Sequence, residues 1–254
     1  MEIKGGAALI TGASSGIGAA TAVRLAARGC NVAVNYLSNA AGAEEVVAAC
    51  RAAGAEAIAL QGDVAQDAEC RRLVEAVREC WGRLDALVNN AGTTRFVDAA
   101  DLEALTVADF TDAYAVNVIG AFQMSRAAAP AMKATGAGAI VNVSTYAAAI
   151  GAGSSIAYTA SKGALNTLTL SLARVLAPEI RVNCVAPTLT DTRWNRAGFG
   201  DERYEKVLAG FESTAPLNAK LVADHVADAI EWLVCGADRM TGEILQISAG
   251  THLG

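Results

Sequence analysis

The chain has 254 residues, of which 53% are apolar and 18% charged, and its formal net charge is −6. This composition excludes a disordered chain, and the 20 basic residues are too dispersed to form the cationic stripe that binds nucleic acid. No apolar stretch reaches the roughly 18 residues that a membrane span requires, so we expect no membrane partner. The first residues lack a secretory signal pattern, which predicts a cytoplasmic protein.

Cysteine and histidine are placed in a way that argues against a metal site. The six cysteines are Cys30, Cys50, Cys70, Cys80, Cys184 and Cys235. None forms a Cys-x-x-Cys pair, so we interpret them as buried thiols and expect no bound metal. Only His225 and His252 are histidines, which disfavours a Ser-His-Asp hydrolase, and His225 lies in a helical pattern as a predicted surface residue.

Short apolar runs alternate with longer helical patterns from end to end. Strands are predicted at 7–11, 31–35, 57–60, 86–89, 139–143, 181–185 and 244–247. Helices are predicted at 17–28, 40–53, 67–81, 107–133, 157–177 and 222–235. Because most strands are apolar without strict alternation, we expect a parallel sheet covered on both faces. The alternation predicts one domain, 1–254, with a Rossmann-like, doubly wound α/β fold of about seven strands in three α/β/α layers.

Residues 188–220 interrupt this alternation. The segment is polar and aromatic, with Trp194, Phe199, Tyr204 and Phe211. A long excursion inside a compact domain is usually a functional lid or a mobile surface segment. We predict a substrate loop or lid, in which the aromatic residues line an organic pocket or form a small satellite core.

A glycine-rich turn, Thr11 to Gly18, follows the first strand and opens the first helix. Glycine there permits a tight turn, close approach of the backbone to a pyrophosphate, and close packing of helix on strand. The helix N-terminus then offers free N–H groups to the phosphates. No Lys-Ser/Thr pair follows, which excludes a nucleotide-triphosphate loop. The predicted contacts are Gly12, Ser14, Ser15, Gly16, Ile17 and Gly18.

The end of the second strand bears on the choice of cofactor. A carboxylate there would bind the ribose hydroxyls of NAD, but the chain has Asn35, Tyr36 and Ser38, which could hydrogen-bond to a 2′-phosphate. This favours NADP(H); NAD(H) stays open because no Arg or Lys is nearby. After the third strand, Asp63 is predicted either to bind the adenine amino group or to act as a helix N-cap.

Tyr158 and Lys162 form the candidate acid–base pair. Their spacing places phenol and ammonium on one helix face, where the ammonium would lower the tyrosine pKa from about 10. Such a tyrosine can exchange a proton with a substrate oxygen. Ser144 and Thr145 end the preceding strand at the sheet edge where ligands bind. The alternative is structural, with Tyr158 as a helix-start aromatic and Lys162 solvated.

Taken in order, these motifs resemble the short-chain dehydrogenase/reductase family in its single-domain form, and most closely its 3-oxoacyl-(acyl carrier protein) reductase-like members. The resemblance covers essentially the whole chain. It is carried by Thr11 to Gly18, Asp63, Asn89 to Gly92, Asn117, Tyr158, Lys162, Pro187 and Thr192.

The resemblance implies a role for several of these residues. Tyr158 would be the general acid/base, Lys162 would bind the nicotinamide ribose, and Asn117 would hold a water of a proton relay. Asn89 to Gly92 would stabilise the sheet and contact the cofactor, and Thr192 would bind the nicotinamide carboxamide. Further predicted cofactor contacts are Val64, Asn90, Ala91, Gly92, Tyr158, Lys162, Pro187, Thr188 and Thr190.

Two positions depart from the family pattern. The substrate-orienting serine is replaced by Thr145, whose methyl group restricts χ1 while its hydroxyl remains, and Ser144 is the second candidate. Thr188 stands where the family has a glycine after Pro187, at the start of the substrate loop. Both departures bear on which substrate the site accepts, and neither removes a group that the reaction needs.

These observations predict NADPH-dependent reduction of a ketone, including acyl thioesters of the 3-oxoacyl type. The alternatives are an NAD-dependent secondary-alcohol dehydrogenase acting on a sugar, steroid or cyclic alcohol, and a catalytically silent NADP-binding regulator. The helices at 107–133 and 157–177 carry apolar residues on more than one face, which predicts a homo-oligomer. The resemblance implies a homotetramer, and a dimer is the alternative.

Overall fold

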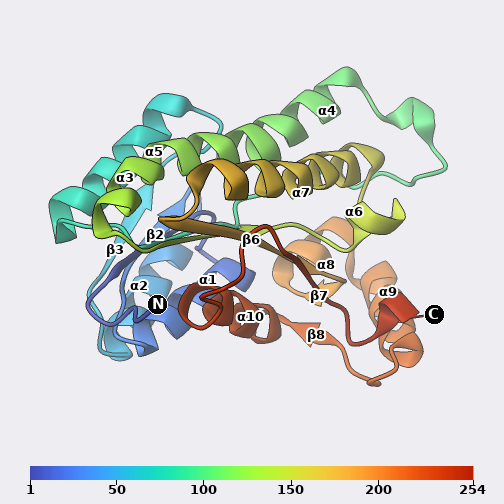
Figure 1. Cartoon of the computed structure of the whole chain (residues 1–254). Helices are drawn as coiled ribbons and strands as arrows, with labels where there is room; N and C mark the ends of the chain where they lie inside the picture. The colour runs from blue at the N-terminus through green and yellow to red at the C-terminus, as the bar shows by residue number, and fades with distance from the viewer. Residues whose placement is uncertain (254) are drawn as a thin grey trace.

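The fold is a seven-stranded parallel sheet with a helical layer on each face (Figure 1), and the computed structural model describes residues 1–253. Its strand order is β3-β2-β1-β4-β5-β6-β9. The strands are β1 (Ala7–Ile10), β2 (Asn31–Tyr36), β3 (Ala57–Gln61), β4 (Ala86–Asn89), β5 (Gly138–Val143), β6 (Ile180–Pro187) and β9 (Ile244–Ile247). All seven lie at predicted positions, and the doubly wound α/β fold is confirmed.

Each face of the sheet packs against its own set of helices (Figure 1). One layer holds α1 (Gly16–Ala27), α2 (Ala40–Ala52) and α10 (Ala223–Cys235). The other holds α3 (Asp67–Trp81), α5 (Ala121–Thr135) and α7 (Ile156–Leu176). Side chains of a strand alternate between faces, so Ala8 and Ile10 join one core cluster while Ala7 and Leu9 join the other.

The strand order reverses between β1 and β4. After β3 at one edge, the chain crosses back to place β4 on the other side of β1. Connections on either side of such a switch point diverge and leave a crevice at the carboxyl ends of the strands, where ligands bind in open α/β sheets. The glycine-rich turn after β1 and the segment after β4 both lie at this crevice.

The helix predicted at 107–133 is divided in the structure. It comprises α4 (Val107–Tyr114), a π-helical turn η2 (Ala115–Gly120) and α5. Asn117, at the centre of the π turn, is 1% exposed and bonds to Thr93 and to Ser161 of α7. These tertiary bonds accompany the local widening, and π turns are frequent at functional sites.

Residues 188–220 are more ordered than the predicted loop. The segment contains β7 (Thr190–Asp191), α8 (Arg193–Phe199) and α9 (Asp201–Thr214), and β8 (Leu221–Val222) pairs in parallel with β7. Three short helices, η1 (Leu102–Ala104), α6 (Ala147–Ile150) and η3 (Thr251–Leu253), complete the described elements. The predicted lid is thus a pair of helices beside the end of the sheet (Figure 1).

The cysteine prediction is correct for Cys30, Cys50, Cys70 and Cys184, which are buried. It is wrong for Cys80, which is exposed at the end of α3, and for Cys235, which is half-buried. His225 is exposed, and its Nδ1 accepts a hydrogen bond from the Val222 N–H. None of the helices within residues 1–253 has the length and apolar content needed to cross a membrane.

Candidate active site

The glycine-rich turn is held against the end of β4. A Cβ on Gly12 would lie 2.9 Å from Ala91 Cα, and one on Gly18 would lie 2.6 Å from Asn90 Nδ2. The Asn90 amide donates to the carbonyls of Thr11 and Gly12, at 2.9 Å each. Glycine is therefore required here because the two connections touch.

The same turn fits a dinucleotide pyrophosphate. Gly12 and Gly16 have φ angles of +60° and +59°, a region that favours glycine. The first turn of α1 carries no acidic side chain, and the N-cap Ser15 leaves the first N–H groups without a side-chain bond. A helix N-terminus in this state attracts an anion. Ser14 is half-buried and Ser15 exposed beside it.

Asn35 has a different role from the predicted phosphate contact. Its side chain is 2% exposed, with Oδ1 accepting from Gly12 N at 3.2 Å and Nδ2 donating to the carbonyls of Leu60 and Gly62. These bonds occupy the amide within the protein, so Asn35 supports the turn from beneath. Tyr36 is half-buried and Ser38 exposed, which leaves these two predicted contacts accessible.

Asp63 is not a helix N-cap. The N-cap of α3 is Gln66, whereas Asp63 Oδ1 accepts from Ala65 N at 2.9 Å in the preceding turn. The N-cap alternative is therefore wrong. Val64, its neighbour, is 6% exposed, and its carbonyl accepts a hydrogen bond from Gln123 of α5.

Tyr158 and Lys162 stand on the first turns of α7. Ser155 caps this helix by accepting a hydrogen bond from Tyr158 N at 3.2 Å. Lys162 is 3% exposed, its Nζ donates to the Val143 carbonyl at 2.7 Å, and burial lowers its pKa to about 8. Its Nζ lies 5.7 Å from the centre of the Tyr158 ring.

The pKa of Tyr158 departs from the sequence expectation. Desolvation raises the pKa of the phenol above its ordinary value, where the sequence predicts a lowering by Lys162. The ammonium is itself desolvated and directed at the Val143 carbonyl, so the burial of the phenol dominates. At neutral pH the phenol is therefore protonated, the form that a general acid needs.

The two hydroxyls after β5 are placed differently. Ser144 is 3% exposed, and its Oγ donates to the Lys162 carbonyl at 3.2 Å. Thr145 is half-buried; its Oγ1 donates to the Pro187 carbonyl at 3.3 Å and accepts from Ala147 N at 3.2 Å. Ser144 thus ties α7 to the sheet, whereas Thr145 keeps access to the surface.

Asn117, Gly92 and Lys162 meet at one point. A Cβ on Gly92 would lie 3.3 Å from Asn117 Oδ1 and 3.5 Å from Lys162 Nζ. The Asn117 amide accepts from Thr93 N and donates to the Thr93 carbonyl and to Ser161 Oγ. These bonds use both amide hydrogens of Asn117, so a water that it holds would bond to one of its two carbonyl oxygens, Oδ1 or the main-chain oxygen.

The predicted cofactor contacts after β6 lie at the same end of the sheet as the glycine-rich turn. Thr192 caps α8, and its methyl carbon is 3.8 Å from where a Cβ on Gly16 would be, so it borders the glycine-rich turn. Thr188 N donates to the Ile247 carbonyl at 2.9 Å. Thr190 is 3% exposed in β7, where its hydroxyl donates to the Thr188 carbonyl. Its buried side chain braces the segment rather than facing a ligand.

The sequence predictions missed an aromatic residue at the site, Phe96. Its ring lies 5.6 Å from the ring of Trp194 and 4.9 Å from that of Phe199, in edge-on geometry. Trp194 in turn lies 5.9 Å from the Tyr158 ring. Its position in the sequence could have identified it, because Phe96 follows the predicted cofactor segment Asn89 to Gly92 by four residues.

Comparisons with known proteins identify the family of this chain. A family model described as short chain dehydrogenase matches residues 6–202. Ketoacyl reductase 2 of the granaticin polyketide synthase of Streptomyces violaceoruber is 40% identical, covering 97% of this chain and 96% of that one. A 3-oxoacyl-(acyl-carrier-protein) reductase of Staphylococcus aureus is 35% identical, over 97% and 98% of the two chains.

A solved structure extends the likeness to three dimensions. The short chain dehydrogenase of Burkholderia cenocepacia J2315, crystallised in complex with NADP, matches with a TM-score of 0.88 and 38% identity. The match covers 99% of this chain and 100% of that one. The chain therefore belongs to the short-chain dehydrogenase family. It is an oxidoreductase of the kind that acts on CH–OH groups with a nicotinamide cofactor.

Proposed function

We propose that this protein reduces a ketone, including 3-oxoacyl-type substrates, with NADPH as the hydride donor and Tyr158 as the general acid. The observation that carries the proposal is the pair on α7, a protonated Tyr158 phenol next to the buried ammonium of Lys162. Both stand beside a glycine-rich turn that fits a pyrophosphate. The relatives named as ketoacyl reductases support the same direction of reaction.

Residues of this chain would hold the cofactor along the crevice. Gly12, Gly16 and the α1 N-terminus would take the pyrophosphate, and Thr192 would reach the nicotinamide from the opposite side. When bound, the nicotinamide supplies the hydride. Lys162 would bind the adjoining ribose through its ammonium protons, after turning from the Val143 carbonyl.

The preference for NADPH rests on the end of β2. No carboxylate stands between Asn35 and Asn39, and the first turn of α2 carries no acidic side chain. A 2′-phosphate there would meet the Ser38 hydroxyl and the positive end of the α2 dipole without charge repulsion. The NADP complex of the Burkholderia cenocepacia relative supports this preference.

Side chains of this protein would carry out the proton transfer and stabilise the charge that develops. Tyr158 donates its proton to the oxygen of the carbonyl as negative charge develops on it. Thr145 Oγ1 turns from the Pro187 carbonyl and donates a second hydrogen bond to the same oxygen. Lys162 then lowers the cost of the phenolate that Tyr158 becomes, and a water on the Asn117 carbonyl would return the proton.

The segment 188–220 would act as the lid of a single nucleotide-binding domain. Its helix α8 already contacts Tyr158 through Trp194 and borders the glycine-rich turn through Thr192. Closure over a bound substrate would exclude water from the proton transfer. We also propose that the protein is a homo-oligomer, most simply a tetramer.

The experiment that tests the proposal compares wild type with Tyr158→Phe on a panel of ketones and β-ketoacyl thioesters, followed by NADPH absorbance. We expect kcat to fall by about 10²–10⁴-fold, the usual contribution of a positioned acid. NADPH affinity, measured by fluorescence titration, should stay within about threefold. Tyr114→Phe, on α4, is the matched control and should keep full activity.

Four results would contradict parts of this proposal. Equal rates for wild type and Tyr158→Phe would exclude Tyr158 as the acid. A tenfold or greater preference for NADH would overturn the cofactor. Tight binding of NADPH without turnover of any ketone would favour the regulator, and turnover confined to secondary-alcohol oxidation with NAD would favour the alcohol dehydrogenase.

A further inference from the structure

Four aromatic rings, one of them the candidate acid, lie in a row beside the site. The row begins at Tyr158 on α7, passes to Trp194 on α8, then to Phe96 after β4, and ends at Phe199 on α8. The neighbouring rings are 5.9, 5.6 and 4.9 Å apart, centre to centre. All three contacts are tilted or edge-on, the arrangements that aromatic rings prefer. The Tyr158 ring therefore lies in contact with this group of aromatic side chains.

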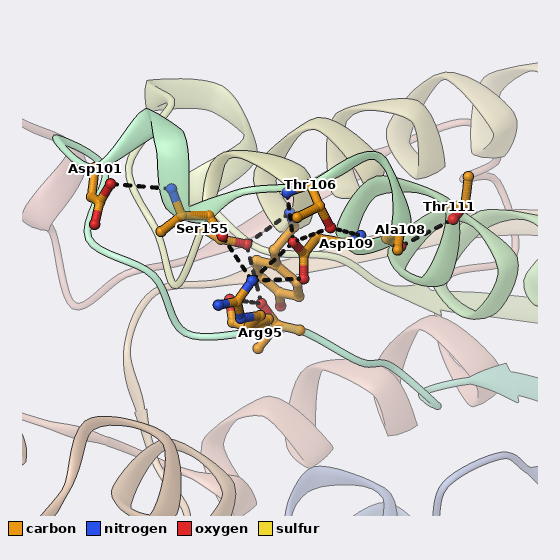
Figure 2. Close-up of polar contacts among 10 residues, drawn as sticks. Arg95, Asp101, Thr106, Ala108, Asp109, Thr111 and Ser155 are labelled. Carbon is orange, nitrogen blue, oxygen red and sulfur yellow. Dashed lines mark hydrogen bonds and ion pairs between the residues drawn. The ribbon is translucent and has the colours of Figure 1, made fainter.

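Phe96 is a fixed part of the row because its segment is anchored on both sides. Figure 2 shows Arg95 directed at Asp109, and its Nη1 lies 3.0 Å from Asp109 Oδ2 and 2.7 Å from the Ala104 carbonyl. Asp109 also accepts from Thr106 N at 2.7 Å. On the other side of Phe96, Val97 N donates to the Ser154 carbonyl at 2.8 Å.

Helix α8 is fitted to the Phe96 ring. A Cβ on Gly198 would overlap that ring, so the helix approaches it as closely as a backbone can. Arg203 of α9 lies over the Phe199 ring at 5.7 Å and pairs with Asp98, which joins the lid to the Phe96 segment. Trp194 is the most exposed member of the row, with a relative exposure of 43%. A substrate that enters beside Tyr158 would therefore displace this ring with the smallest loss of buried contact.

The free-energy cost of moving the Trp194 ring depends on which substrate group takes its place next to Tyr158. A substrate that enters separates the Trp194 ring from Tyr158 and gives up that aromatic contact. A planar ring next to the ketone restores it, because its face and edge can meet Trp194 on one side and Phe96 on the other. A saturated chain or ring offers only dispersion contacts and restores less.

We propose that Phe96 and Trp194 form an aromatic clamp that selects ketones bearing a planar aromatic ring beside the carbonyl. The inference rests on the proposed ketone reduction and names its substrate class. Trp194 supplies most of the selectivity, and Phe96, held by Arg95, is the wall against which the substrate ring packs.

The test uses two methyl ketones with eight carbons and a six-membered ring, acetophenone and cyclohexyl methyl ketone. Only the first ring is planar. We expect wild type with NADPH to prefer acetophenone by about tenfold or more in kcat/KM, which aromatic contacts of the substrate ring with Trp194 and Phe96 can supply. Trp194→Ala should reduce this ratio to within about twofold, chiefly by raising KM for acetophenone, and Trp194→Phe should keep most of it.

Two further variants control for folding and for general effects. Trp232→Ala removes a tryptophan of similar exposure, 46%, from α10 and should leave the ratio unchanged. Phe96→Leu keeps an apolar side chain at the wall and should lower the ratio by about threefold, so the clamp is tested even if Trp194→Ala fails to fold.

The outcomes separate this inference from the function on which it rests. Reduction of both ketones with no preference for acetophenone, or a preference unchanged in Trp194→Ala and Phe96→Leu, would overturn the clamp and leave the proposed function intact. Failure of wild type to reduce any ketone or β-ketoacyl thioester would overturn the proposed function, and the clamp with it.

Discussion

Lys162 is a cation held almost completely out of water. Its only described hydrogen bond is to the Val143 carbonyl, and burial lowers its pKa from 10.5 to about 8. A buried cation without a counter-ion is costly, so in the proposed mechanism Lys162 would stabilise the cofactor and the phenolate at the expense of the unliganded fold. Replacing Lys162 should therefore raise the free energy of unfolding and lower the catalytic activity.

We predict that Lys162→Met stabilises the cofactor-free protein at pH 7 while abolishing ketone reduction. The lowered pKa corresponds to about 3 kcal/mol at pH 7, and the lost bond to Val143 offsets part of it, leaving a gain of about 1–2 kcal/mol. Between pH 8 and 10.5 the unfolded chain holds the proton that the folded chain has lost, so wild-type stability recovers as pH rises. Urea unfolding at pH 7 and pH 10 measures this difference. A Lys162→Met variant less stable than wild type at pH 7 would show that burial of the charge is not costly.

We expect replacement of Thr145 to affect mainly catalysis and replacement of Ser144 to affect mainly stability. Thr145→Val keeps the shape but removes the half-buried hydroxyl, and we expect kcat to fall by about 10²-fold, as for one lost donor to a developing oxyanion. Ser144→Ala removes the bond to the Lys162 carbonyl and should cost about 1 kcal/mol of unfolding free energy with a smaller loss of kcat. Steady-state kinetics and urea unfolding of both variants test this. The reverse pattern would assign the substrate contact to Ser144.

The sequence predicts the positions of some site residues but not the roles that depend on their contacts in the folded chain. The types and spacing of Tyr158 and Lys162 are enough to place both on one helix face, because that follows from helix geometry alone. The role of Asn35 depends on its bonds to Gly12, Leu60 and Gly62, which the sheet register brings together. The raised pKa of Tyr158 likewise depends on burial, a property of the folded chain.

At the scale of elements, two differences from prediction have different causes. The π turn at Ala115–Gly120 depends on tertiary bonds of Asn117, so the continuous helical periodicity of 107–133 conceals it. Helix α9 carries a local signal that the prediction passed over, since Glu202 and Lys206 are spaced for an i, i+4 ion pair and lie 2.8 Å apart. Its amphipathic sequence is sufficient to indicate a helix.

The connection between β4 and α4 provides a prediction about positioning. Replacing Arg95 by Met removes the bonds to Ala104 and Asp109 that hold the segment carrying Phe96 (Figure 2). We expect KM for acetophenone to rise by about three- to tenfold with kcat within about twofold, because the reacting groups are not altered. Thr111→Val is the control, since its hydroxyl bonds only to the Ala108 carbonyl within α4. An unchanged KM would mean that Phe96 is held without Arg95.

At the scale of the molecule, the sheet is predictable because each strand is apolar on both sides. Strands such as Ala7–Ile10 and Gly138–Val143 are buried at every residue, which a parallel sheet between two helical layers requires. The order of the strands is not set by this pattern, because right-handed crossovers allow more than one order in a doubly wound sheet. The 53% apolar content exceeds what one such core needs, however, and part of it lies on the outer helices.

Several of the exposed apolar residues lie on α4, η2, α5 and α7, and Figure 1 shows α4, α5 and α7 together on one side of the sheet. They are Val107, Phe110, Ile119, Phe122, Leu170 and Val175. Exposed apolar side chains on one helical layer are typical of an interface, and a symmetric oligomer would bury the same face of each copy. We therefore expect the native mass to be a multiple of the chain mass.

The test is to place charges on this face. Phe122→Asp combined with Leu170→Asp should shift the protein to a smaller species in analytical ultracentrifugation, because burying two carboxylates in an apolar contact is unfavourable. Leu102→Asp, in the exposed turn η1, is the matched control and should leave the mass unchanged. The smaller species should retain NADPH binding, since the glycine-rich turn lies on β1 and α1, away from this face. A wild-type monomer, or an unchanged mass for the double variant, would show that the apolar face has another use.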